Sequence, residues 1–139
     1  MASEEGVVPR ADKERSVSSG AEVTVYTEDV FDVGWPDAPH RILRNTAVRE
    51  WEAAGKPPSG RRPGSGTIIA TRTRDGQTSE IERYSSVTAT PEYAGDLEYF
   101  PLWAGQSCGL VHDIKPAGQI VRDTVREAEQ VIGRLCSSS

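Results

Sequence analysis

A regular pattern of apolar residues marks the C-terminal part of the chain. The apolar positions recur at alternating steps of four and three residues: Val121, Val125, Ala128, Ile132 and Leu135. This spacing gathers the side chains on one face of an α-helix, and Pro116 stands just before it, where proline suits a first helical turn. The pattern predicts an amphipathic helix over residues 116–135 whose apolar face packs against the rest of the molecule.

A β-hairpin is predicted in the middle of the chain. Asp75-Gly76 is a strong signal for a two-residue turn, and strand-like runs flank it at 67–73 and 78–84. The second run is polar, which predicts that one face of the hairpin contacts water.

Two shorter strands are expected before the hairpin. Residues 21–26 alternate between β-branched and other side chains, which is typical of a strand. Residues 41–45 fit a short strand or the approach to a helix. After the hairpin, residues 85–95 are rich in Ser and Thr and are expected to form a loop.

Two short helices complete the expected elements. Residues 10–19 are mostly charged or small and polar, so a helix there would bury little. Thr46 fits an N-cap for a second helix that ends at Ala54, before Gly55. Trp51 on this second helix is expected to lie in the core.

Two irregular segments have different expected roles. Residues 31–40 contain a glycine and two prolines, and Phe31 and Trp35 are expected to pin this loop to the body; the alternative is a wall of a substrate site. Residues 56–66 are rich in Pro and Gly and are predicted to form a flexible loop with no residue that anchors it. This segment lacks the Lys-Ser/Thr end of a phosphate-binding P-loop.

Composition and charge narrow the class of protein. The 139 residues suffice for one domain or part of one, and an apolar content of 36% allows only a thin core. A net charge of −5 argues against non-specific nucleic-acid binding, and no apolar run is long enough for a membrane helix. Cys108 and Cys136 show neither metal-ligand spacing nor a disulfide framework, so a cytoplasmic location is expected.

Candidate catalytic motifs lack their partners. Residues 105–109 read G-x-S-x-G, the pattern of a nucleophile elbow, but no central strand is predicted before Ser107. The one histidine downstream, His112, lies too near in sequence for triad geometry. His40 and His112 also lack metal-ligand spacing. From the residues alone, the chain is a small α+β protein without a self-sufficient active site.

A block near the C-terminal helix carries a family resemblance. It reads Trp-Ala-Gly-Gln-x-x-Gly-Leu at 103–110 and Pro-Ala-x-x-Ile-Val at 116–121. Together with the stretches 2–45, 48–66 and 101–135, it resembles the C-terminal part of the nitronate monooxygenase family, formerly called 2-nitropropane dioxygenases. The related flavin-dependent enoyl reductases share the block.

The resemblance implies a fold and a chemistry. Family members are flavoproteins with an FMN-binding (β/α) barrel, or TIM barrel, and they oxidise alkyl nitronates with molecular oxygen. Residues 1–139 would then form an α+β C-terminal fragment of such a barrel, with short strands, one hairpin and a long amphipathic helix. The FMN-phosphate loops and the catalytic histidine belong to a part of the family that is not matched, and neither His40 nor His112 lies in that histidine motif.

The function implied is that of a nitronate monooxygenase-like oxidoreductase, incomplete and inactive as this chain alone. FMN is the cofactor at family level and is not expected to bind to this chain by itself. The alternative is a non-catalytic interaction module, or a split-enzyme subunit that docks on a barrel-bearing partner. The expected partners are a nitronate substrate and either a second copy or that barrel partner, without nucleic acid or membrane.

The same block implies candidate site residues, although none is catalytic. Trp103 would offer an apolar face to the substrate. Gln106 would approach the flavin through its amide, and Gly105 through its lack of a side chain. The alternative is that Trp103 lies in the core and that Gln106 caps backbone groups.

Exposed apolar surface is expected around this block in the absence of a barrel. The residues expected to lose cover are Leu102, Trp103, Leu110 and Val111. Exposed apolar patches mark interaction or aggregation sites, so self-association with Trp103 at the contact is predicted.

Overall fold

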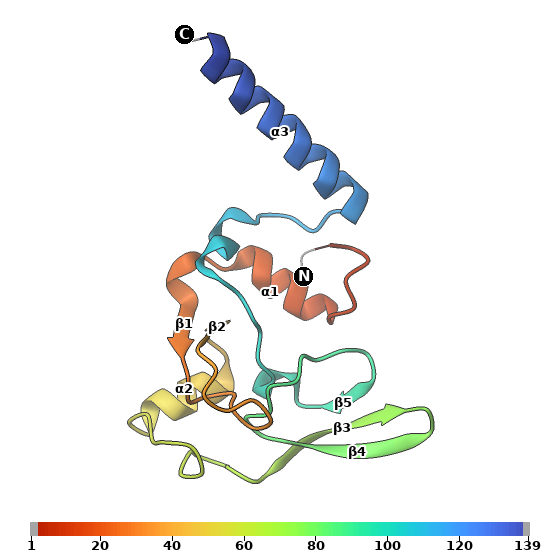
Figure 1. The fold of residues 1–139 in the computed structure, drawn as a ribbon. Helices are drawn as coiled ribbons and strands as arrows, with labels where there is room; N and C mark the ends of the chain where they lie inside the picture. The colour runs from red at the N-terminus through yellow and green to blue at the C-terminus, as the bar shows by residue number, and fades with distance from the viewer. Residues whose placement is uncertain (1–2, 138–139) are drawn as a thin grey trace.

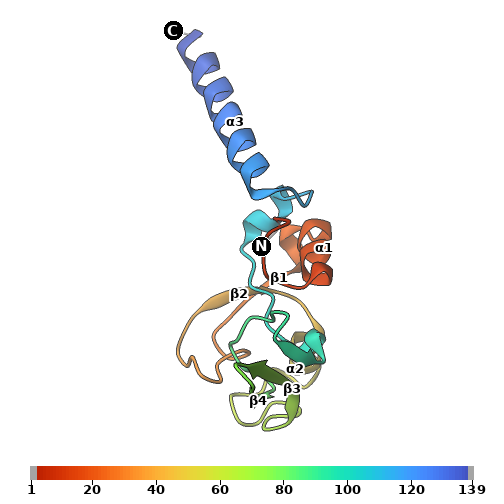
Figure 2. The same ribbon diagram turned by 90° about the vertical axis from the view of Figure 1, so that its right-hand side faces the viewer.

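Two small antiparallel sheets and several short helices form a body from which one long helix extends (Figures 1 and 2). This computed structural model describes residues 3–137. The elements in chain order are α1 (Arg10–Ser18), the 3-10 turn η1 (Ala21–Val23), β1 (Thr24–Thr27), β2 (His40–Leu43), α2 (Thr46–Ala53), β3 (Ile68–Arg74), β4 (Gln77–Glu82), β5 (Tyr93–Gly95), η2 (Leu97–Tyr99), η3 (Gln106–Leu110) and α3 (Ala117–Ser137). The mixture of helices and strands agrees with the expected α+β class, and the described residues contain no closed barrel.

The first sheet joins β1 to β2, with Val25 opposite Ile42. The strand expected from residue 21 begins at Thr24 instead. The preceding residues form η1, and the Thr24 hydroxyl closes this turn by donating to the Ala21 carbonyl at 2.7 Å. The second predicted strand is confirmed as β2.

The second sheet has the order β4-β3-β5, and its hairpin is confirmed. Asp75 and Gly76 both have positive φ, which is the conformation that a two-residue turn of this kind requires. The strand β5 lies in the segment expected to be a loop. Its Gly95 lies so close to β3 that an added Cβ would stand 2.4 Å from the Ile69 carbonyl oxygen, so only glycine fits this pairing.

The main core lies between the first sheet, α2 and the loops around them. Its buried members are Val30, Phe31, Ile42, Ala47, Val48, Trp51 and Tyr84. Both Trp51 and Phe31 therefore occupy the core, as expected. The N-cap of α2 is Asn45 rather than Thr46: its side-chain oxygen accepts from the Val48 amide at 3.1 Å, and its Nδ2 donates to the Phe100 carbonyl at 2.7 Å.

Arg62 anchors the segment 56–66, which corrects the expectation that no residue there does so. Its side chain is 2% exposed and pairs with the Asp32 carboxylate at 2.7 Å. The same guanidinium donates to the backbone carbonyls of Asp29 and Val30 and lies 4.3 Å from the Tyr84 ring centre. The flexibility of the remaining residues in the segment stays a prediction.

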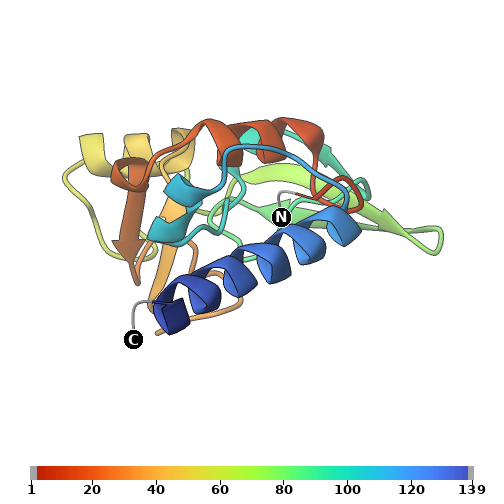
Figure 3. The same cartoon turned by 90° about the horizontal axis from the view of Figure 1, so that it is seen from above.

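The predicted C-terminal helix is present as α3, but its expected packing is wrong. No residue of α3 is buried, and Val121 in the apolar stripe is 63% exposed. Only the base of α3 lies beside the body, and the rest rises away from it (Figures 1 and 2). In the view from above, α3 runs across the body in projection (Figure 3). The base is held by polar contacts, including the Ala117 amide donating to the Glu5 carboxylate at 2.8 Å.

Candidate functional site

The segment that carries the family resemblance runs beside β2. The Leu43 amide donates to the Leu102 carbonyl at 2.9 Å, and the Ala104 amide donates to the Arg41 carbonyl at 3.2 Å. These bonds place Trp103 opposite Ile42 in an isolated antiparallel bridge. A backbone ladder therefore fixes the position of Trp103, although no long strand is present.

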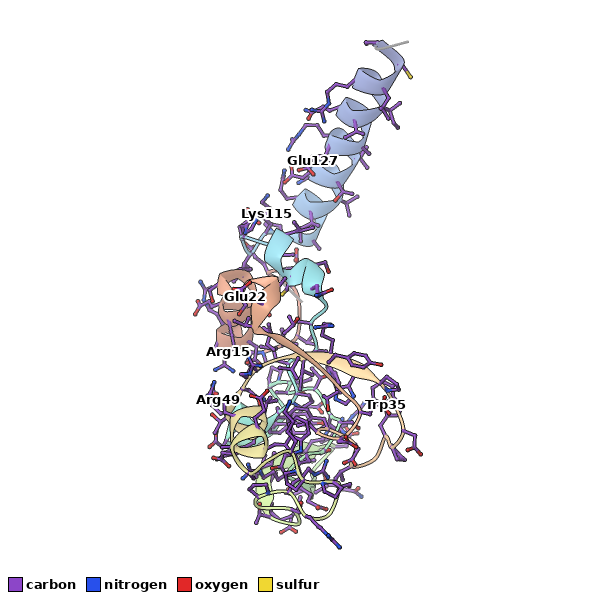
Figure 4. The ribbon with its side chains drawn as sticks, turned by 90° about the vertical axis from the view of Figure 1, so that its left-hand side faces the viewer. Arg15, Glu22, Trp35, Arg49, Lys115 and Glu127 are labelled. Atoms are coloured by element: carbon purple, nitrogen blue, oxygen red, sulfur yellow. The ribbon has the colours of Figure 1, made fainter. Side chains whose placement is uncertain are left out.

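Three rings gather around Trp103. Its ring centre lies 6.3 Å from Phe31, 5.8 Å from Trp35 and 4.9 Å from His40, in each case in an edge-on arrangement. The indole nitrogen donates to the Thr88 hydroxyl at 3.0 Å. Phe31 belongs to the core, whereas Trp35 is 51% exposed at the edge of the body (Figure 4).

His40 contributes a hydrogen-bond acceptor to this aromatic cluster of Phe31, Trp35, His40 and Trp103. Its Nδ1 lies 2.7 Å from the Ala38 carbonyl oxygen, which can only accept, so Nδ1 carries the proton. The neutral ring then has an unprotonated Nε2, which is buried without a hydrogen-bond partner among the described residues. No signal in the sequence pointed to His40, because its neighbours Trp35 and Trp103 are brought to it by the fold.

Trp103, Gly105 and Gln106 are not enclosed together in one pocket. Trp103 is half-buried, while Gly105 and Gln106 are exposed at the start of η3. A Cβ added at Gly105 would meet only the Ser107 hydroxyl, at an ordinary 3.6 Å, so no close approach within this chain demands the glycine. These three residues therefore do not surround a cofactor, and their approach to FMN stays a prediction.

The nucleophile-elbow interpretation of Ser107 fails in the structure. Ser107 is exposed on the five-residue 3-10 helix η3. The backbone before η3 is extended, and it is not part of a central strand. Cys108 is buried, as expected, with its sulfur 3.7 Å from the Gly20 carbonyl oxygen. At Gly109 an added Cβ would stand 3.1 Å from the Ala21 amide nitrogen, so the small residue serves packing against η1.

The exposed apolar side chains expected between Leu102 and Val111 are found in part. Leu102 is buried against Leu43 and Cys108, so the expectation is wrong at this residue. Leu110 and Val111 are exposed, as expected. Self-association through Trp103 stays a prediction.

The described residues offer neither a metal site nor a membrane-crossing helix. Between residues 3 and 137, no three His, Cys, Asp or Glu side chains are grouped so that they could hold a metal ion. Over the same range, the helices lack the combination of length and apolar character that crossing a bilayer requires.

A charged cluster beside the core was not predicted from the sequence. Arg83 is buried, pairs with the Glu50 carboxylate at 2.5 Å and lies 4.3 Å from the Tyr99 ring centre. The hydrogen bond from Arg83, together with one from the Tyr99 hydroxyl, holds the pKa of Glu50 below its ordinary value. Because Glu50 on α2, Arg83 and Tyr99 join three separate parts of the body through these contacts, we assign the cluster a structural role.

In a comparison with solved structures, the fold of this chain is similar to one part of a longer chain. The similar structure is a point mutant of FabK from Thermotoga maritima, with a TM-score of 0.57 and 24% sequence identity. The superposition covers 99% of this chain and 33% of the FabK chain, so this chain spans about a third of the length of that protein. No protein-family profile matches the sequence, and no curated protein does.

Proposed function

We propose that this chain is the C-terminal part of a flavin-dependent oxidoreductase with a (β/α) barrel. The observation that carries the proposal is the likeness to FabK, a flavin-dependent oxidoreductase, along 99% of this chain. The block at 103–110, which resembles the same class of flavoenzymes, supports it independently of the fold.

In this proposal the chain supplies an aromatic wall and leaves most of the cofactor site to other strands. Cofactor sites in such barrels are built from residues at the ends of several strands. Trp103 is held in place by its backbone bridge and by its bond to Thr88, so its ring has a fixed orientation. Gln106 is exposed and can donate and accept through its amide. FMN, when bound, would supply the redox chemistry.

Oxidation of alkyl nitronates with oxygen is the finer proposal. It rests on the resemblance of the sequence block to nitronate monooxygenases, which the fold does not distinguish from enoyl reductases. The wall that this chain contributes is apolar and aromatic, with the acceptor Nε2 of His40 behind it.

A second proposal is that the chain acts as a docking subunit for a barrel-bearing partner. The exposed apolar stripe of α3 favours it, because no element of the body covers this stripe. The same stripe would pack on the rest of a barrel if that barrel lay on one polypeptide.

The test is a chimera in which this chain replaces the matched third of FabK. We expect the chimera to consume oxygen when an alkyl nitronate is added, and Trp103→Ala to lower that rate about tenfold or more by removing the substrate wall. Trp35→Ala, which removes an exposed ring of the same cluster, is the matched control. A chimera that unfolds cooperatively and reduces enoyl substrates, but ignores nitronates, would overturn the nitronate proposal alone.

A further inference from the structure

We propose that α3 pairs in antiparallel orientation with α3 of a second copy of this chain. The proposal concerns this chain without a barrel bound to it, and a barrel packed on the apolar stripe of α3 would compete with the second copy. It rests on the spacing of the apolar residues, on the charges beside them and on the place where the body joins the helix.

The apolar residues of α3 include a seam of the coiled-coil type. The seam comprises Val121, Val125, Ala128, Ile132 and Leu135, which repeat on average every 3.5 residues. A repeat of 3.5 keeps side chains facing a partner helix, and the exposed Ile120 and Val131 widen the apolar face on one side of the seam. Four of the five residues are exposed large hydrophobics, between 52% and 67% accessible.

The two flanks of the seam differ in chemistry. Arg122 and Glu129 lie on one flank, and Thr124 and the exposed Val131 lie on the other. In a parallel pair, opposite flanks meet, so the charged flank would face the apolar one. In an antiparallel pair, each flank meets its own counterpart.

The antiparallel arrangement therefore satisfies both flanks at once. Arg122 of each copy lies beside Glu129 of the other, which gives two pairs of opposite charge. The seam then has Val121 opposite Ile132 and Val125 opposite Ala128. The small Ala128 allows the two helices to approach closely near the centre of the overlap.

A groove lies at the base of α3, beside the seam. Its volume is about 540 Å³, and Leu110, Val111 and Ile120 line it together with polar and charged side chains. In the antiparallel pair, the C-terminal end of the partner helix arrives at this base. Since the body joins α3 at its N-terminal end (Figure 1), antiparallel pairing places the two bodies at opposite ends of the helix pair.

A charge exchange tests the contact in the full chain. Sedimentation equilibrium over a wide concentration range should show a monomer–dimer equilibrium. Arg122→Glu and Glu129→Arg should each weaken dimerisation about tenfold or more, because each turns two attractive pairs into repulsive ones. The double exchange should restore it. Gln130→Lys, on the opposite face of α3, is the control and should change nothing.

Two results would overturn the proposal. One is a chain that remains monomeric throughout, which would leave the seam for another occupant such as a barrel-bearing polypeptide. The other is a dimer whose affinity ignores both single charge reversals, which would place the contact elsewhere.

Distance measurement between spin labels tests the orientation. Cys136 is exposed and Cys108 is buried, so labels attach selectively to Cys136 near the end of α3. In the antiparallel pair the two attachment points lie about 28 Å apart along the helices, from the 1.5 Å rise per residue. A parallel pair would bring them within about 10 Å, the spacing of packed helices, and would contradict the orientation.

Discussion

Arg62 shows how a single side chain fixes a segment that has no regular structure. Its guanidinium is withdrawn from water and is compensated by the Asp32 carboxylate, by the carbonyls of Asp29 and Val30 and by the face of Tyr84. Such a group stabilises the folded state only while its partners are present, because an unpaired buried charge is costly. The loop 56–66 and the loop before β2 are therefore tied to each other.

Replacing Arg62 should destabilise the protein far more than replacing its neighbour. Arg62→Ala leaves the Asp32 carboxylate without its counter-charge and two carbonyls without their donor, and we expect a loss of about 3 kcal/mol in the free energy of unfolding. Arg61→Ala, at an exposed position, should stay within about 0.5 kcal/mol. Urea unfolding of both variants measures the difference, and equal losses would contradict the anchoring role of Arg62.

The pair of Glu50 and Arg83 should make stability depend on pH in the acid range. The hydrogen bond from Arg83 lowers the pKa of Glu50 below the ordinary 4.5, so the folded state favours the ionised carboxyl. This contribution is present above pH 4.5 and is lost as the pH falls through the lower, folded-state pKa. The difference in unfolding free energy between the parent and Glu50→Gln should therefore shrink on acidification. A difference that stays constant from neutral pH to about pH 3 would exclude the linkage.

Among the elements, α2 and α3 show the same amphipathic character with different outcomes. Val48 and Trp51 of α2 are buried in the core, whereas the apolar stripe of α3 is exposed along its whole length. The difference arises because α2 is held between the first sheet and the loops, while α3 leaves the body after its first turn.

A charge introduced into each helix should separate these two situations. Val125→Asp should leave the thermal unfolding of a dilute sample unchanged, because Val125 contacts no core in the monomer. Val48→Asp should abolish cooperative unfolding, since Val48 is fully buried and the carboxylate would have no partner. A large fall in melting temperature for Val125→Asp in dilute solution would mean that the stripe packs against the body after all.

Limited digestion with trypsin should reveal which element opens first. The arginines of α3 lie on a helix without packing, and unpacked elements open most readily. In a dilute sample, in which the chain is monomeric, we therefore expect the first cuts after Arg122 or Arg126, ahead of Arg61 in the anchored loop. In Arg62→Ala, cleavage after Arg61 should become early. An early cut at Arg61 in the parent would show that the loop is mobile despite its anchor.

The sequence predicted the elements that depend on local chemistry. The turn residues Asp75-Gly76 determine the hairpin within a few positions, and the spacing of the apolar stripe determines the helical state of α3. The strand β5 was missed because its three residues become a strand only by pairing with β3, more than twenty residues away. The burial of Arg62 and the exposure of the α3 stripe were missed for the same reason: both depend on contacts with distant segments.

The candidate site followed the same division. Sequence resemblance pointed to Trp103, and the structure shows how its ring is held; its role in a substrate site stays a prediction. The ring of His40 and the exposed Trp35 could not be connected to Trp103 from their positions in the sequence. Only the folded loop before β2 brings the three rings together.

At the scale of the whole molecule, the chain combines a body with its own core and a helix that lacks a partner. The body has a buried core around Phe31 and Tyr84, whereas α3 has no buried residue. The proposal that the chain is one part of a flavoenzyme barrel would account for this combination, because such a part keeps local cores and exposes the faces on which the remainder packs.

The flavin-to-protein ratio of the FabK chimera, read from its visible absorption spectrum, tests the central claim most directly. If this chain is the C-terminal part of a flavin barrel, the purified chimera should carry about one flavin per chain, while this chain alone should carry none in stoichiometric amount. A chimera that unfolds cooperatively but is colourless, or an isolated chain that binds flavin one to one, would contradict the claim.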